Sequence, residues 1–322
     1  MLLDLPGGFH TLSPLTVPTL ALIALTVVYL RGWYRLQTSL PKVLRTWRLA
    51  AFVGGLFSLW AAAESPLAPL DHRFLTAHMV QHLVLMTVAA PLILLGLPPI
   101  ILLNGLPKYV VNGVLEPLLR RAPVRTTGRM VGHPAFCWMA STAAVIGWHV
   151  PAVFELGLQS ERWHGVEQAC FFLAGLLFWW PVIQPWPSLA RWPRWSVPLY
   201  LFLATLPCDA LSAFLTFCDR VVYPHYLSAH RALSTSALAD QERAGALMWV
   251  CITFAYLVPA AAVTIQILSP HSYFPKTEAY ESGSQRELTP REWHGIASGD
   301  REMTPGAQDG HKNKTIFESP AS

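Results

Sequence analysis

The chain has 322 residues, of which 53% are hydrophobic and only 13% are charged, and its formal net charge is +4. A soluble globular domain carries about 25% charged residues because water covers its surface, so this composition argues against a soluble domain. The small net charge gives no sign of a nucleic-acid-binding surface. The five scattered cysteines, without ligand spacing, argue against a disulfide framework.

Seven apolar segments are long enough to cross a bilayer as helices, which takes about 20 residues each. In chain order they are residues 15–30, 49–64, 74–97, 134–151, 164–183, 196–217 and 244–268. We therefore predict an all-α integral membrane protein with seven transmembrane helices, formed by residues 1–268. Residues 269–322 are polar and lack an apolar helical period, so we expect a disordered cytoplasmic tail.

Prolines interrupt the third segment. Pro91 lacks a backbone N–H and predicts a kink within the helix. Pro98 and Pro99 are expected to end this helix. The short apolar stretch that follows, residues 98–107, is then expected to lie along the membrane interface.

Basic residues are divided unequally between the loops. Twelve follow spans one, three and five: Arg31, Arg35, Lys42, Arg45, Arg48, Lys108, Arg120, Arg121, Arg125, Arg129, Arg191 and Arg194. The N-terminus and the other loops hold five: Arg73, Arg162, Arg220, Arg231 and Arg243. Because Lys and Arg concentrate on the cytoplasmic side, we predict that the N-terminus lies outside and the C-terminus inside.

Histidines gather at the predicted outer end of the bundle. Six of the twelve fall there: His78, His82, His149, His164, His225 and His230. Burying an ionisable side chain in lipid costs several kcal/mol, so such residues within a span are candidate functional residues.

The sharpest local motif is HMVQH at residues 78–82. His78 and His82 are four residues apart, so both imidazoles lie on one helix face and can reach one metal ion. Met86 continues the same face inward. Imidazole together with thioether sulfur suits copper, since thioether is a soft ligand for Cu(I). The alternative is a hydrogen-bonded histidine pair inside the bundle, with Met86 as ordinary packing.

Two further histidines face each other across a short predicted outer loop, residues 152–161. His149 lies in WHVP and His164 in RWHGVEQ. Glu167 follows His164 by three residues and could act as a second ligand or as the acceptor that orients an imidazole. Alternatively, both histidines serve as structural anchors at the membrane interface.

The segment between spans six and seven adds His225, Asp240 and, one turn into span seven, Met248. These offer nitrogen, oxygen and sulfur ligands, although Asp240 could instead favour a helix N-terminus. Asp209 lies within span six, where a carboxylate is costly to bury. It is expected to be protonated, to be paired within the bundle, or to form part of a proton or ion path.

Taken together, these sequence motifs resemble those of the multi-span CtaG family of cytochrome c oxidase assembly factors. The resemblance covers roughly residues 70–268 and is carried by HMVQHLVLMTVAAPLILLGLPP (78–99), GWHVPAVFELGL (147–158), WHGVEQ with FFLAGLLFWWPVI (163–183), LTFCDRVVYPHY (215–226) and DQERAGALMWV (240–250). His78 and His82 match the HMxQH of the family, His149 its WHxP, His164 its WH pair and His225 its YPHY. One position departs from it, since Gln168 stands where the family pattern WHxxEH places a histidine.

This resemblance implies a multi-pass protein of the bacterial inner membrane that is needed to assemble active haem–copper oxidase. It further implies copper as the ligand, cytochrome c oxidase subunits as partners and no enzymatic activity. Two other functions remain open from the residues themselves. One is a membrane haem protein with two axial histidines, and the other is a copper or proton transporter with Asp209 on its path. A retinal protein is excluded because the seventh span holds no lysine for a Schiff base.

The unequal distribution of basic residues yields a topology prediction. Reporter fusions after residues 40, 120, 190 and 280 should read cytoplasmic, and fusions after residues 68 and 230 should read external, because basic loops stay inside. Paired alkaline phosphatase and green fluorescent protein fusions measure this. An external reading at residue 120 would overturn the orientation and the outer location of the histidines.

Overall fold

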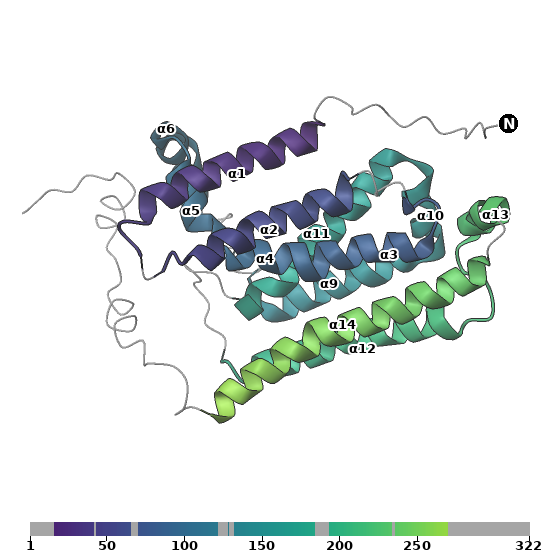
Figure 1. Cartoon of the computed structure of the whole chain (residues 1–322). Helices are drawn as coiled ribbons and strands as arrows, with labels where there is room; N and C mark the ends of the chain where they lie inside the picture. The colour runs from purple at the N-terminus through teal and green to yellow at the C-terminus, as the bar shows by residue number, and fades with distance from the viewer. Residues whose placement is uncertain are drawn as a thin grey trace, which may run out of the picture. The chain divides into compact units, whose positions relative to one another are not determined.

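The computed structural model describes residues 16–41, 43–65, 70–121, 128, 132–183, 193–233 and 236–269. Within these ranges the regular secondary structure is entirely helical (Figure 1), which confirms the predicted all-α class. The predicted tail lies outside the described residues except for Ser269.

The helices, in chain order, are α1 (Val17–Leu36), α2 (Thr46–Ala63), α3 (Leu75–Leu83), the π-helix η2 (Val84–Ala89), α4 (Ala90–Leu95), α5 (Pro98–Gly105), α6 (Lys108–Val110), the π-helix η3 (Val111–Leu115), α7 (Glu116–Arg120), α9 (Pro134–His149), α10 (Pro151–Gln159), α11 (Glu161–Ile183), α12 (Ser196–Phe217), α13 (Pro224–Leu233) and α14 (Ala237–Leu268). Six helices are long and apolar enough to cross a membrane when Leu75–Leu95 is counted as one. The pair α9 and α10, which is bent by 75°, brings the number to seven if it is counted as one span. The predicted multi-span helical architecture is therefore confirmed.

Two segments that we expected to be loops are helices. Residues 152–161 belong largely to α10, and the region of His225 belongs to α13. In each case a proline opens the helix, because the first helical position needs no backbone N–H. Val150, which precedes Pro151, is extended and so breaks the helix between α9 and α10.

The third span is continuous but irregular. The disturbance expected at Pro91 takes the form of the π-helix η2, directly before the turn that holds Pro91. The wider turn of a π-helix makes room for the proline ring. It also accommodates the carbonyl group of the preceding turn, which lacks a hydrogen-bond donor because proline has no backbone N–H. The span ends as predicted before Pro98, where Leu97 adopts a left-handed conformation with φ 54°. The chain then turns into α5, which packs against α1.

The helices run back and forth, so their ends meet at two opposite sides of the bundle. The start of α3 lies with α10 and α13 at one end, which we call the histidine end, whereas α5 and α6 lie at the other (Figure 1). Helix α14 lies alongside α12 and contacts α3, and α11 packs against α9, η2 and α4. This arrangement brings the first turns of α3 and α11 together at the histidine end.

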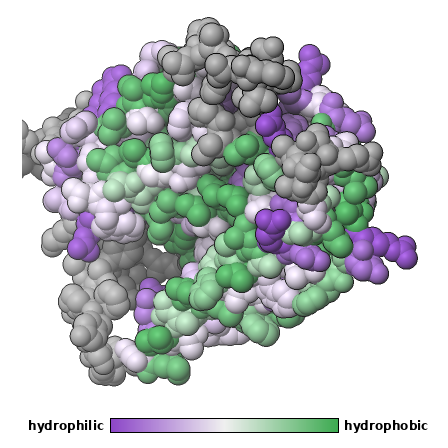
Figure 2. Space-filling view, turned by 45° about the vertical axis from the view of Figure 1, so that its right-hand side comes forward, coloured by the Kyte–Doolittle hydropathy of each residue, from purple (hydrophilic) through white to green (hydrophobic). Residues whose placement is uncertain are grey.

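Large apolar side chains cover much of the exterior of the bundle. Phe202 and Leu206 on α12, and Phe254 and Val258 on α14, are all more than half exposed. Figure 2 shows hydrophobic residues over much of the face in view. Apolar surface of this extent suits contact with lipid and is rare on soluble monomers.

Close approach of α11 to the third span requires a glycine at position 175. A Cβ atom there would lie 2.9 Å from Met86 Cα and 3.0 Å from Ala90 Cβ. Gly175→Ala should therefore lower the free energy of unfolding by about 1–3 kcal/mol through overpacking. The measurement is thermal unfolding of the purified protein in detergent. Gly147→Ala is the control, because no atom lies within 4 Å of its Cβ position, and an equal loss in both variants would contradict the packing argument.

Candidate metal centre

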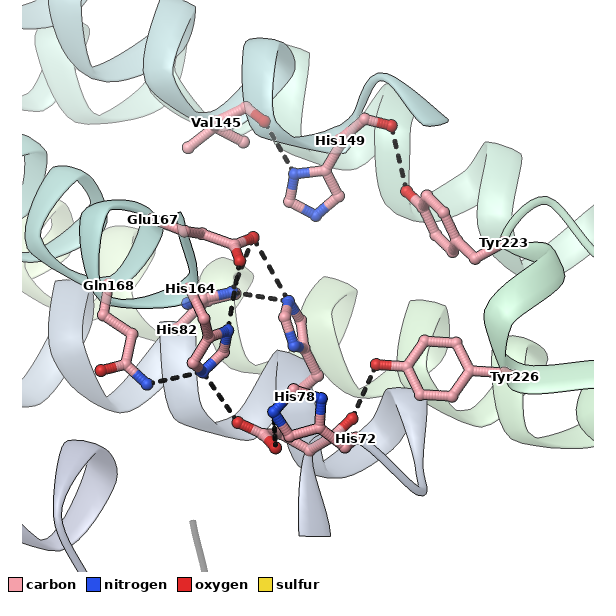
Figure 3. Close-up of polar contacts among 11 residues, drawn as sticks. His72, His78, His82, Val145, His149, His164, Glu167, Gln168, Tyr223 and Tyr226 are labelled. Atoms are coloured by element: carbon pink, nitrogen blue, oxygen red, sulfur yellow. Dashed lines mark hydrogen bonds and ion pairs between the residues drawn. The ribbon is translucent and has the colours of Figure 1, made fainter. Parts of the chain in front are cut away.

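The most deeply buried polar group at the histidine end consists of His78 and His82 from α3 and Glu167 from α11 (Figure 3), which we call the buried triad. The two imidazole Nε2 atoms are 2.8 Å apart. Glu167 Oε1 lies 3.4 Å from Nε2 of His78 and 3.3 Å from Nε2 of His82. The i, i+4 spacing thus places both imidazoles on one face, as the sequence predicts, and the carboxylate of α11 meets them there.

The spacing of these donors fits a metal ion. With metal–ligand bonds of about 2.0–2.1 Å, two donors at a tetrahedral angle stand about 3.3 Å apart. The two imidazole–carboxylate distances match this value, and the shorter distance between the imidazoles corresponds to a narrower angle. The same short distance also suits a hydrogen bond between two neutral imidazoles, so geometry alone supports both interpretations.

A second group adjoins the triad and shares His78 with it. Ligand atoms of Asp71, His78 and His164 all lie within 4.8 Å of one another. His164 Nε2 is 2.9 Å from Asp71 Oδ2, and His164 Nδ1 is 3.4 Å from Glu167 Oε2. His164 therefore links Asp71 to the buried triad. Gln168, at the position that departs from the family pattern, lies 2.7 Å from His164 Nε2 through its amide nitrogen.

Asp71 and His72 lie in the turn before α3, and both hold the protonation state that a ligand needs. Burial opposes ionisation of Asp71, but the hydrogen bond and charge of His164 outweigh it, so the pKa of Asp71 lies below its ordinary value. Burial also lowers the pKa of His72, against the effect of Asp71. Near neutral pH, Asp71 is thus a carboxylate and His72 a neutral imidazole.

The sequence analysis did not single out these two residues. A signal was present, because an Asp–His pair stands directly before span three, in the same predicted outer loop that leads to His78. Asp71 and His164 are far apart in the chain, so no helical period in the sequence could have predicted their contact.

His149, at the end of α9, is buried beside the triad. Its Nδ1 lies 2.7 Å from the carbonyl oxygen of Val145, so Nδ1 carries the proton and donates it. Nε2 is then an acceptor, and it is buried without a hydrogen-bond partner among the described residues. An unprotonated imidazole nitrogen of this kind is free to bind a metal ion.

The two predicted sulfur ligands lie next to these histidines. Met86 and Met248 line a cavity of about 20 Å³, together with His82 and His149. Met79 and Cys208 also line it, and neither was predicted. A cavity of this size holds about one water-sized sphere. Sulfur and imidazole donors therefore meet around one small space.

Two predicted residues stand apart from both groups. His225 lies near the half-exposed His72, with its Nε2 3.2 Å from the carbonyl oxygen of His72. Asp209 lies on α12 and belongs to neither ligand group. The side chain of His230 lies outside the described residues.

Asp240 lies at the start of the seventh span, as one of the two interpretations of its sequence expects, but it also makes a contact that the sequence did not predict. It lies within the first turn of α14, and its carboxylate acts on α3. Oδ2 accepts a 2.7 Å hydrogen bond from the backbone N–H of Leu75, and Oδ1 accepts a 2.6 Å bond from the Thr76 hydroxyl. Asp240 thereby supplies acceptors for the first turn of α3, just before His78.

Tyrosines near α13 hold the backbone on both sides of the site (Figure 3). The Tyr226 hydroxyl donates a 2.7 Å hydrogen bond to the carbonyl oxygen of Asp71. The Tyr223 hydroxyl donates a 3.1 Å bond to the carbonyl oxygen of His149. The donor groups of the candidate metal centre are therefore fixed by contacts from α13 and α14.

The fold and the site define a multi-span helical membrane protein with a buried histidine–carboxylate group at one end. Comparison with protein families shows that residues 27–269 match the family of cytochrome c oxidase caa3 assembly factors (Caa3_CtaG), and the chain belongs to that family. The resemblance seen in its sequence motifs is thereby confirmed.

Curated relatives occur in mycobacteria. An uncharacterised protein of Mycobacterium bovis is 24% identical over 224 residues, which cover 68% of this chain and 34% of that protein. An uncharacterised protein of Mycobacterium leprae is 23% identical over 252 residues, covering 76% and 37% respectively. The chain thus spans about a third of the length of these relatives. No solved structure is significantly similar to it.

The contact of Asp240 with α3 leads to a stability prediction. Asp240→Ala should lower the free energy of unfolding by about 1–3 kcal/mol, because it leaves the Leu75 N–H without its acceptor and removes the shorter of the two hydrogen bonds of the Thr76 hydroxyl. Thermal unfolding in detergent measures the loss. Glu242→Ala removes an exposed carboxylate two residues away and should change stability little. Equal midpoints for the two variants would show that Asp240 does not anchor α3.

Proposed function

We propose that the protein assists assembly of a cytochrome c oxidase in the bacterial inner membrane by binding copper at the buried triad and passing it on. It acts as a carrier of the ion and catalyses no reaction. The observation that carries the proposal is the position of one carboxylate oxygen of Glu167 at 3.3–3.4 Å from two imidazole nitrogens. Family membership supplies the link to the oxidase.

The donor set favours copper over other divalent ions. Two imidazoles and a carboxylate can hold several transition metals. The adjacent cavity adds thioether sulfur from Met79, Met86 and Met248, and soft sulfur ligands select Cu(I). His82 belongs to the triad and also lines the cavity. One continuous group of donors can therefore hold copper in either oxidation state.

The two alternative functions receive less support from the geometry. Axial haem ligands stand on opposite faces of a porphyrin, whereas the rings of His78 and His82 touch each other, with centroids 4.3 Å apart. A path through Asp209 would require a connection to the buried histidines, and Asp209 belongs to neither ligand group.

Metal analysis of the purified protein tests the proposal. The protein should bind about one Cu per chain without a Soret band. His82→Ala and Glu167→Gln should each weaken Cu(I) affinity at least about tenfold, because each removes one donor of the triad. Competition with a chromophoric Cu(I) chelator measures the affinity. Oxidase activity of membranes that carry each variant should fall, although the protein remains inserted.

His133→Ala is the control, since His133 caps the start of α9 at the opposite end of the bundle from the triad. Its Cu(I) affinity should equal that of the wild type. A Soret band that disappears with His82→Ala would favour the haem protein instead. Unchanged Cu(I) affinity in both triad variants would show that the triad is a hydrogen-bonded structural group.

A further inference from the structure

A continuous series of ligand side chains leads from the surface to the buried triad. His72 Nε2 lies 3.7 Å from Asp71 Oδ1, and Asp71 Oδ2 lies 2.9 Å from His164 Nε2. His164 Nδ1 in turn lies 3.4 Å from Glu167 Oε2. No step in this series exceeds the distance that a shared metal ion or one water molecule would span.

Exposure is highest at His72 and lowest at the triad, with Asp71 and His164 between them. The side chain of His72 is 39% exposed, that of His164 11% and that of Asp71 4%. At the triad, exposure is 1% for Glu167 and 0% for His78. An ion from solution can thus contact His72 directly, whereas it can reach His78 and Glu167 only by passing other groups.

We propose that Asp71 and His164, with His72 at the surface, form a receiving site through which copper enters the buried triad. The inference rests on the proposed function, because it assigns the route to the same centre. It goes beyond that function in giving a role in metal transfer to Asp71 and His72.

The geometry of the receiving site suits passage of an ion. His164 Nε2 lies 2.9 Å from Asp71 Oδ2, and ligand atoms of Asp71, His78 and His164 all lie within 4.8 Å of one another, so one ion could contact all three. The anionic Asp71 attracts the cation, and His164 then lies between Asp71 and Glu167.

Transfer proceeds by ligand exchange. His78 belongs to both groups, so it can bind the incoming ion while Asp71 and His164 still hold it. Bonds from Glu167 and His82 then form as those from Asp71 and His164 break. Each donor contributes its own lone pair, the oxidation state of copper stays the same, and no electron donor or acceptor is required.

The role of a receiving site is kinetic. A group that binds the ion only in passage lowers the barrier in both directions and leaves the final affinity unchanged. A ligand of the final centre, in contrast, mainly slows release of the ion. Association and dissociation rates measured on the same variant therefore distinguish the two roles.

The variant His164→Gln separates metal binding from structure, since glutamine keeps an N–H group for Asp71 or Glu167 but lacks the imidazole lone pair. Cu(I) transfer from its bicinchoninate complex to the full-length protein in detergent is followed by stopped-flow absorbance. Both rate constants should fall about tenfold, and the dissociation constant should change less than threefold. Asp71→Asn should also slow association.

Glu161→Gln is the matched control, because it removes an exposed charge from the first turn of α11 outside both ligand groups. Its rates should equal those of the wild type. Association rates within twofold of wild type for His164→Gln and Asp71→Asn would overturn the receiving site and leave the triad intact. Weaker affinity through faster dissociation alone would also overturn it, since His164 would then be a ligand of the final centre. Absence of Cu(I) binding by the wild type would instead refute the proposed function, and the receiving site with it.

Discussion

The carboxylate of Glu167 imposes the constraint on which the rest of the site depends. A charge buried in an apolar helix bundle is strongly unfavourable unless it is paired and hydrogen-bonded. Three imidazoles, those of His78, His82 and His164, surround it at 3.3–3.4 Å. These contacts fix α3 and α11 relative to each other. They also require space, which Gly157 of α10 provides, because a Cβ atom there would lie 2.6 Å from Glu167 Oε2.

Contacts from the first turn of α14 and from the region of α13 hold the donors of the candidate site in position. Asp240 anchors the start of α3, and the hydroxyls of Tyr226 and Tyr223 hold the backbone of Asp71 and His149. Each of these contacts joins residues far apart in the chain. A metal site is more effective when such contacts fix its ligands, since ordering them at the moment of binding would cost affinity. The helix α13 and the start of α14 therefore belong to the functional architecture.

Much of the fold follows from the length of apolar segments, and for span six the predicted bounds, residues 196–217, coincide with α12. The face shared by His78 and His82 follows from helical period. Long-range contacts could not be predicted in this way, so Asp71 was overlooked and the contact of Asp240 with α3 was missed. Pro151 was interpreted as the end of span four and Pro224 as part of a loop, although proline equally well begins a helix. A helical period relates residues within one helix, whereas the site combines residues from several helices.

The order of donor types through the site gives the proposed route a direction. Oxygen and imidazole donors stand at the surface and in the triad, and thioether sulfur lines the cavity beyond His82. Carboxylate and imidazole bind Cu(II) well, whereas thioether prefers Cu(I). An ion that moved inward would therefore meet softer ligands in the cavity than at the triad, and Cu(I) would bind there more favourably than Cu(II). His82 belongs to the triad and also lines the cavity, so it adjoins both the oxygen and imidazole donors and the thioether donors.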